Sequence, residues 1–192
     1  MYHQSVPPFS SWFVIRVSGE WTLTLAQKMT AQHASFGATT EFFRLGLVSR
    51  TMSVDVIDDW ATLLISESSS PSFALCDLAT AKSTDRAIVL DALLNFPKSE
   101  EDREFAWAMF CEFLYDDLKS GKRSLKDSIY ALYGLERLHE APEHLEIPIT
   151  ILEDEYSLAR DEVWGTMDEV SARTLELLLT YFDDETPKPI KG

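Results

Sequence analysis

Along most of the chain, hydrophobic residues recur every three or four positions, the period of an α-helix with one buried face. The clearest example begins at Ser99, where Glu100, Glu101 and Asp102 follow an N-capping serine and open a long helix to about Ser120. The same pattern predicts helices over residues 39–48, 53–65, 73–80, 84–96, 124–138, 149–164 and 166–182, with N-caps at Ser53, Thr84 and Ser124. A loop is predicted around Pro142 and Pro148.

The first part of the chain has a different pattern. Trp12–Val17 is rich in aromatic and β-branched residues, and after Ser18-Gly19 the residues 20–25 alternate between polar and apolar. Two such runs around a two-residue link are typical of a β-hairpin. A helix that begins near Thr22 is the competing interpretation.

These elements together predict a mainly α fold, either an irregular helical bundle or a short α-solenoid-like array of seven to nine helices, with the small N-terminal β-hairpin attached. The sequence shows no self-similarity at a fixed period, which favours the bundle. We expect residues 1–185 to form a single helical domain with a soft boundary at residues 66–71, where four serines precede Pro71. Residues 186–192 are expected to form a flexible tail.

The composition suits a globular domain. Hydrophobic residues make up 45% and aromatic residues 11% of the 192 residues, enough for a sizeable core. Cys76 and Cys111 lie in apolar runs, without the neighbouring basic groups that activate a thiol, and are expected to be reduced core residues. With neither a signal peptide pattern nor an apolar run of about 18 residues, we expect a cytoplasmic protein that does not cross a membrane.

Charge is distributed unevenly along the chain, whose formal net charge is −15. Residues 1–50 contain four basic and two acidic residues, whereas the chain from Glu140 onward contains fourteen acidic and four basic residues. Such a field repels nucleic acids and anionic membranes and attracts basic partners. Solubility alone is the alternative explanation for the acidity.

Candidate metal and phosphate sites lack the spacing that their chemistry requires. His139 and His144 flank Glu140 somewhat as in a zinc-binding helix, but ligands on one helical face stand four residues apart, and Pro142 interrupts any helix here. The seven glycines are scattered, so no phosphate-binding loop is present in the sequence. We therefore expect no metal site and no cofactor.

Residues 42–62 match the outline of a DNA-binding helix-turn-helix, with Arg44 and Arg50 nearby. The second helix of this motif would carry Asp55, Asp58 and Asp59 into the major groove, where they would face phosphates. We expect no nucleic-acid binding.

The two predicted C-terminal helices are rich in carboxylates. Asp154, Asp161 and Glu162 fall on one side of the first helix, and a turn at Gly165 would place a similar row of the second helix beside them. Such a face suits rapid capture of a basic protein, because complementary charge raises association rates. A solvated helix surface is the alternative. The predicted partner-binding residues are Asp154, Glu155, Asp161, Glu162, Asp168 and Glu169.

The segment Trp107–Pro142 combines an aromatic-rich helix, a short basic link and the pattern Leu-x-x-x-Ile-Tyr-Ala-x-Tyr. It resembles the second half of a family of small uncharacterised bacterial proteins encoded near polymorphic-toxin loci and regarded as immunity proteins. The segment Phe43–Ala61, with Gly46-Leu47-Val48-Ser49 and Asp55-Val56-Ile57, resembles the first half of that family. The resemblance implies a cytoplasmic binder that blocks a cognate toxin, and it implies no active-site residues.

The resulting hypothesis is a non-enzymatic protein-binding protein of the bacterial immunity type, which neutralises a basic toxin through an acidic helical face. A helical scaffold or adaptor protein with apolar contacts is the alternative. A carboxylate-based enzyme is the third interpretation, and it requires two carboxylates in a buried setting that raises the pKa of one of them.

Overall fold

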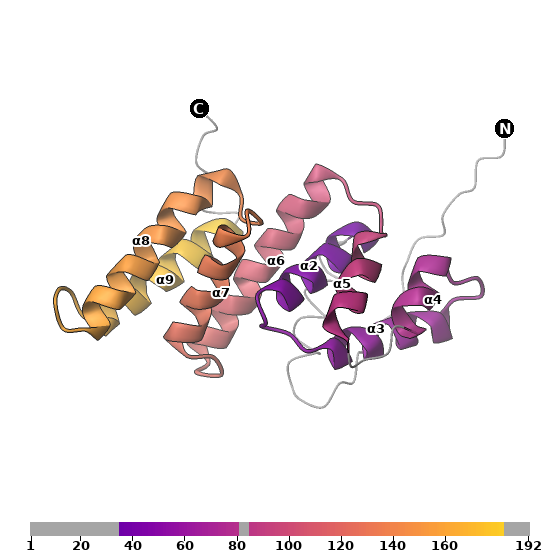
Figure 1. Cartoon of the computed structure of the whole chain (residues 1–192), viewed down its shortest axis with the longest axis horizontal. Coiled ribbons are helices and arrows are strands. Elements are labelled where there is room, and N and C mark those ends of the chain that lie inside the picture. Colours follow the sequence, from indigo (N-terminus) through magenta and orange to yellow (C-terminus); the bar gives the residue numbers. More distant parts are fainter. Residues whose placement is uncertain (1–34, 81–84, 183–192) are drawn as a thin grey trace. The chain divides into compact units, whose positions relative to one another are not determined.

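The structure is a computed structural model that describes residues 35–80 and 85–182 (Figure 1). Within these ranges all regular secondary structure is helical, which confirms the predicted mainly α fold. All described residues belong to one compact unit that begins at Ser35. The eight described helices are α2 (Phe36–Val48), α3 (Val54–Glu67), α4 (Phe73–Thr80), α5 (Arg86–Leu94), α6 (Glu100–Lys119), α7 (Leu125–Arg137), α8 (Glu143–Arg160) and α9 (Met167–Phe182).

Some predictions concern residues that the structure does not describe. The β-hairpin over residues 12–25, the capping role of Thr84 and the flexible tail at 186–192 all lie outside the described residues. The helix predicted after Thr84 is α5, whose first residue is Arg86 and whose N-cap is Asp85. Residues 66–71, the predicted soft boundary, run from the end of α3 into the short connection to α4, and these two helices contact each other.

Serine N-caps set the starts of several helices. At α6, the Ser99 hydroxyl oxygen accepts a hydrogen bond from the backbone N–H of Asp102 (3.1 Å), and Asp102 accepts one from the N–H of Ser99 (2.8 Å). This capping box satisfies two backbone donors that a helix start otherwise leaves free. At α7, the Ser124 hydroxyl oxygen accepts a hydrogen bond from the backbone N–H of Asp127 (3.1 Å). The predicted starts of α6 and α7 are therefore confirmed.

The predicted loop at Pro148 is wrong, because α8 begins at Glu143 and contains this proline. Pro148 lacks the N–H that would bond to the carbonyl of His144, so the helix loses one hydrogen bond there. Leu145 and Ile149, which lie on either side of the proline, are both buried. Their burial favours continuing the helix through the proline.

The predicted end of α8 at Trp164 is also wrong, because the helix stops at Arg160. Beyond it, Glu162 and Gly165 adopt left-handed backbone angles, with φ of 56° and 74°. The backbone N–H groups of Val163 and Trp164 both bond to the carbonyl of Leu158, which closes the helix end. Such left-handed residues are the usual way to satisfy the last carbonyl groups of a helix.

Helix α2 lies in the core of the described residues and packs against α5 and α6 (Figure 1). It is buried on all sides for most of its length, and its buried residues include the charged pair Glu41 and Arg44. Phe43 of α2 packs on Trp60 of α3, with ring centroids 4.9 Å apart. Phe42 meets Phe113 of α6 edge to face at 6.0 Å.

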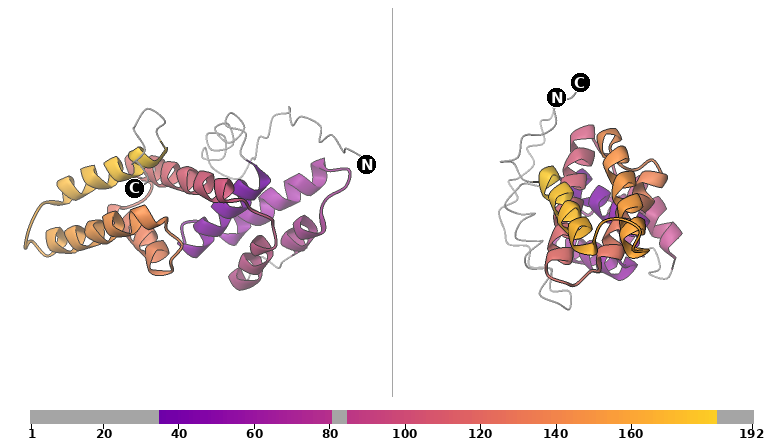
Figure 2. Two further views of the ribbon diagram at one scale, coloured as in Figure 1. Left: turned by 90° about the horizontal axis from the view of Figure 1, so that it is seen from above. Right: turned by 90° about the vertical axis from the view of Figure 1, so that its left-hand side faces the viewer.

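The C-terminal helices are assembled around α6. Helix α9 packs on α6, α7 packs on α8, and α8 and α9 lie side by side as a hairpin (Figure 2). Ile129 of α7, Tyr156 and Ala159 of α8 and Val170 of α9 form a hydrophobic cluster between these helices. The contacts of α2 with α6 and of α6 with α9 join helices far apart in the chain. They are typical of a bundle, since solenoid repeats contact only their neighbours.

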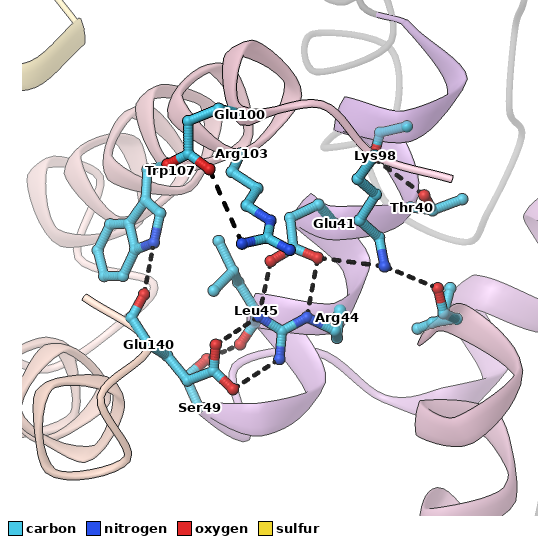
Figure 3. A network of polar contacts seen from close by, with 12 residues as sticks. Thr40, Glu41, Arg44, Leu45, Ser49, Lys98, Glu100, Arg103, Trp107 and Glu140 are labelled. Atoms are coloured by element: carbon cyan, nitrogen blue, oxygen red, sulfur yellow. Dashed lines mark hydrogen bonds and ion pairs between the residues drawn. The ribbon is translucent and has the colours of Figure 1, made fainter. Parts of the chain in front are cut away.

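A buried ion network joins α2 to the loop before α8 (Figure 3). Arg44 donates to Glu41 on its own helix and to Glu140, and Lys98 lies 3.4 Å from Glu41. Two carboxylates and two cations balance, which is the condition for placing charges in a low-dielectric interior. Trp107 of α6 adds a hydrogen bond from Nε1 to the carbonyl of Glu140 at 2.9 Å.

Candidate partner-binding surface

The α8–α9 hairpin carries all six predicted partner-binding residues. Its turn is held by a second capping box, in which Glu169 accepts from the N–H of Thr166 (2.9 Å) and Thr166 accepts from the N–H of Glu169 (3.3 Å). Residues 143–182 contain ten acidic residues and two basic residues, so the hairpin has a strong negative charge. The hairpin is anchored on α7 and α6, which leaves its turn projecting (Figure 2).

Three of the six predicted residues are engaged within the hairpin itself. Glu155 pairs with Arg173 across the two helices. Asp161 forms a two-point ion pair with Arg160, whose hydrogen bonds hold the pKa of Asp161 below its ordinary value. Glu169 caps α9 through Thr166, so these three carboxylates already have partners within the hairpin.

The other three residues, Asp154, Glu162 and Asp168, are exposed and form no ion pair within the described part of the chain. The structure does not place Asp154, Asp161 and Glu162 in one helical row, because α8 ends before the last two. That part of the prediction is wrong. The free carboxylates lie instead on α8, in the turn and at the start of α9.

Apolar residues at the turn are the feature that sequence reasoning missed. Trp164 is 58% exposed and Val163 is 69% exposed, and Met167 beside them is also exposed. A helix that continued to Trp164, as the sequence predicted, would place Val163 in line with the buried Leu152, Tyr156 and Ala159. The signal available in the sequence was Gly165, since a glycine after a helix often marks a turn whose tip is open to solvent.

A small hollow lies inside the hairpin, between the two helices and the turn. Its lining includes Glu155, Trp164, Glu169 and Arg173. Its volume of about 10 Å³ corresponds to one water position. Glu155 is paired with Arg173 and Glu169 caps α9, so both carboxylates at this hollow have structural partners.

The cysteine and histidine side chains, which could act in catalysis or metal binding, have environments that the fold explains. Burial raises the pKa of the Cys111 thiol, and Cys76 is partly exposed and free. The ring of His144 stacks on that of Tyr181 of α9 at 5.6 Å, whereas His139 occupies a left-handed position after α7. Within the described ranges, no three His, Cys, Asp or Glu side chains are grouped as metal ligands would be.

None of the helices in residues 35–80 and 85–182 combines the length and apolar composition that a membrane span requires. Comparison of the chain with protein-family models, with curated proteins and with solved structures finds no match.

Proposed function

We propose that this chain is a non-enzymatic protein-binding protein of the bacterial immunity type, which takes a basic toxin on the turn of its α8–α9 hairpin. The observation that supports the proposal is an exposed Trp164 with Val163 beside it. The nearby carboxylates of Glu162 and Asp168 form no ion pair within the described residues. The immunity role itself rests on the resemblance of residues 43–61 and 107–142 to that family.

The two kinds of residue at the turn have different roles in this proposal. Tryptophan is among the residues that contribute most to protein interfaces, because it buries a large rigid surface and keeps one polar N–H. Glu162 and Asp168 attract a basic partner during approach, which raises the association rate more than the final affinity. The partner therefore presents a basic rim around a pocket for an aromatic side chain.

A cytoplasmic location is part of the proposal. Cys76 and Cys111 are free thiols, as expected in a reducing compartment. A toxin that acts inside the cell would meet its inhibitor there.

An adaptor protein with apolar contacts is the second candidate function. The observation that favours it is the number of exposed apolar side chains on α8, which include Ile147 and Ile151. An adaptor of this kind binds its partners with little dependence on salt, because apolar contacts are not screened by ions.

A toxicity-rescue assay tests the immunity proposal. The product of the neighbouring gene is expressed in a sensitive cell with the full chain, with Trp164→Ala or with Phe73→Ala. Phe73 is a matched control, since this aromatic residue of α4 is also exposed. The full chain and the control are expected to protect the cell, and Trp164→Ala is expected to lose protection.

Two outcomes would overturn parts of the proposal. Absence of rescue by the full chain removes the immunity function. If the chain rescues and binds the toxin, but the association rate is the same at low and high salt, the acidic-turn mechanism is wrong and the adaptor-like mode replaces it.

A further inference from the structure

Helix α8 has a second apolar face in addition to its buried one. The buried face, which covers α7 and α9, consists of Leu145, Ile149, Leu152, Tyr156 and Ala159. On the opposite side, Ile147 is 72% exposed, Ile151 is 50% exposed and Leu158 is 40% exposed. A helix on the surface of a bundle normally has polar residues on its outer side, so the three aliphatic side chains need a separate explanation.

The exposed residues form a straight stripe. Ile147, Ile151, Asp154 and Leu158 follow one another at intervals of four, three and four residues, which keeps them on one side of the helix. The stripe is about 16 Å long, from eleven residues at 1.5 Å each. It contains one carboxylate, that of Asp154, which has no ion pair within the described residues.

From this stripe we infer that the outer face of α8 is the docking site of a basic amphipathic helix of the partner protein. A ridge with anchors four and seven residues apart fits the groove of another helix, whose apolar side chains cover the isoleucines and the leucine. A lysine or arginine of that helix pairs with Asp154. The inference rests on the proposed function and extends the partner contact from the turn to α8.

Charge argues against a second copy of this chain as the occupant. Two α8 helices paired antiparallel along the stripe would bury Asp154 of each copy against aliphatic side chains, without a cation to pair with it. The hairpin also carries ten acidic and two basic residues, so two copies repel each other. A basic helix supplies a cation to pair with Asp154, and the negative charge of the hairpin attracts it.

A peptide titration with the full chain tests the inference. The probe is a fluorescent, helix-stapled synthetic peptide of about 14 residues, or four turns, with leucines along one side and lysines flanking them. A second peptide has glutamate in place of every lysine. The stripe variant is Ile147→Ser with Ile151→Ser and Leu158→Ser, and Asp154→Asn is made separately.

A matched control variant comes from α4 and α5. Phe73, Ile88 and Leu94 are also three exposed large apolar residues, and they are changed to serine together. We expect the stripe variant to weaken binding of the lysine peptide at least about tenfold, as loss of central apolar anchors does. Asp154→Asn is expected to weaken it severalfold, the control variant is expected to bind normally, and the glutamate peptide is expected not to bind the full chain.

Several outcomes would overturn the inference. Equal binding by the stripe variant, equal loss in the control variant or equal binding of the glutamate peptide each contradicts it. A dimer in solution that the stripe variant abolishes would make a second copy the occupant. A melting temperature that falls much further in the stripe variant than in the control variant would show that the chain itself covers the stripe.

The two proposals fail separately. If the stripe variant still rescues cells and Trp164→Ala does not, the function stands and the docking inference falls. If the full chain gives no rescue, the function falls, and the peptide titration still decides whether α8 takes a basic helix.

Discussion

Arg44 and Glu140 are 96 positions apart in the sequence and form a two-point ion pair, with Nη1 2.8 Å from Oε1 and Nη2 2.6 Å from Oε2. Glu140 lies in the loop that leads into α8, and its carbonyl also accepts the indole N–H of Trp107. The start of the candidate binding hairpin is thereby tied to α2 and α6 in the core. Hydrogen-bonded pairs of this planar geometry fix position as well as charge.

Removing Arg44 should strongly destabilise the protein. In Arg44→Ala, Glu41 stays buried with Lys98 as its remaining ionic partner, and Glu140 loses its ion pair. Breaking a buried ion pair from one side costs about 3–5 kcal/mol, so the free energy of unfolding should fall by about 3 kcal/mol or more. Urea denaturation followed by circular dichroism measures the change.

The control for this variant is Arg103→Ala on the same protein. Arg103 pairs with Glu100 at 3.8 Å, and both side chains are mostly exposed. Surface pairs contribute about 0–1 kcal/mol, so the control should unfold nearly as the unchanged chain does. If both arginine variants lose the same stability, the buried network does not have the role assigned to it.

The stability that Glu41 provides should depend on pH. Burial opposes ionisation of Glu41, but the hydrogen bonds and charges of Arg44 and Lys98 outweigh it and lower the pKa below its ordinary 4.5. A lowered folded-state pKa gives stability that is present above about pH 4.5 and is lost as the pH falls through the folded value. The stability difference between the unchanged chain and Glu41→Gln should therefore shrink in acid.

Asp117 supplies a control of the opposite sign. Burial raises its pKa, and Arg123 only partly offsets this effect. Relative to Asp117→Asn, the unchanged chain should therefore gain stability as the pH falls through this raised value. Urea denaturation at several pH values between about 3 and 7 checks both variants, and parallel curves would contradict the assignment.

Glu162 combines a strained backbone with an exposed charge. Its φ of 56° is costly for a residue with a full side chain, whereas asparagine adopts this conformation more readily. Glu162→Asn should raise the free energy of unfolding by about 1 kcal/mol and, under the proposed function, slow association with the basic partner severalfold, since one steering charge is lost. Thermal unfolding and stopped-flow association measure the two effects.

His139→Asn is the matched control for the turn. His139 has the same left-handed φ of 56° and an exposed side chain, but it follows α7 and is remote in sequence from the turn of the hairpin. It should gain similar stability without slowing association. Equal slowing in both variants would remove the specific role of Glu162.

Gly37 and Gly134 should respond oppositely to alanine. A Cβ on Gly37 would lie 2.6 Å from a carboxylate oxygen of Asp102 and 2.9 Å from the backbone carbonyl of Pro97, because α2 approaches the start of α6 closely. Gly37→Ala should cost about 1–3 kcal/mol, as overpacking does. A Cβ on Gly134 meets nothing within 4 Å, so Gly134→Ala should stabilise α7 by about 0.5–1 kcal/mol. Melting temperatures decide between these directions, and equal shifts would contradict the close approach.

Short-range patterns in the sequence were enough to place most helices. The serine caps at Ser99 and Ser124 act within three residues of themselves, and the predicted segment Phe73–Thr80 matches α4 residue for residue. The turn at Gly165 was also predicted, since glycine is the residue that readily adopts φ of 74°. These features depend on residues close together in the sequence, so they can be recognised before the tertiary structure is known.

Only the tertiary structure decided which side chains remain available for binding. Glu155 is not a free carboxylate of the predicted face, because α9 brings Arg173 into an ion pair with it. Helix α8 continues through Pro148, because Leu145 and Ile149 are buried there. The sequence alone did not identify the outer apolar stripe of α8, because its exposure depends on how the neighbouring helices pack. Periodicity shows that a helix has an apolar face, but the neighbouring helices α7 and α9 determine which apolar residues they cover and which ones stay exposed.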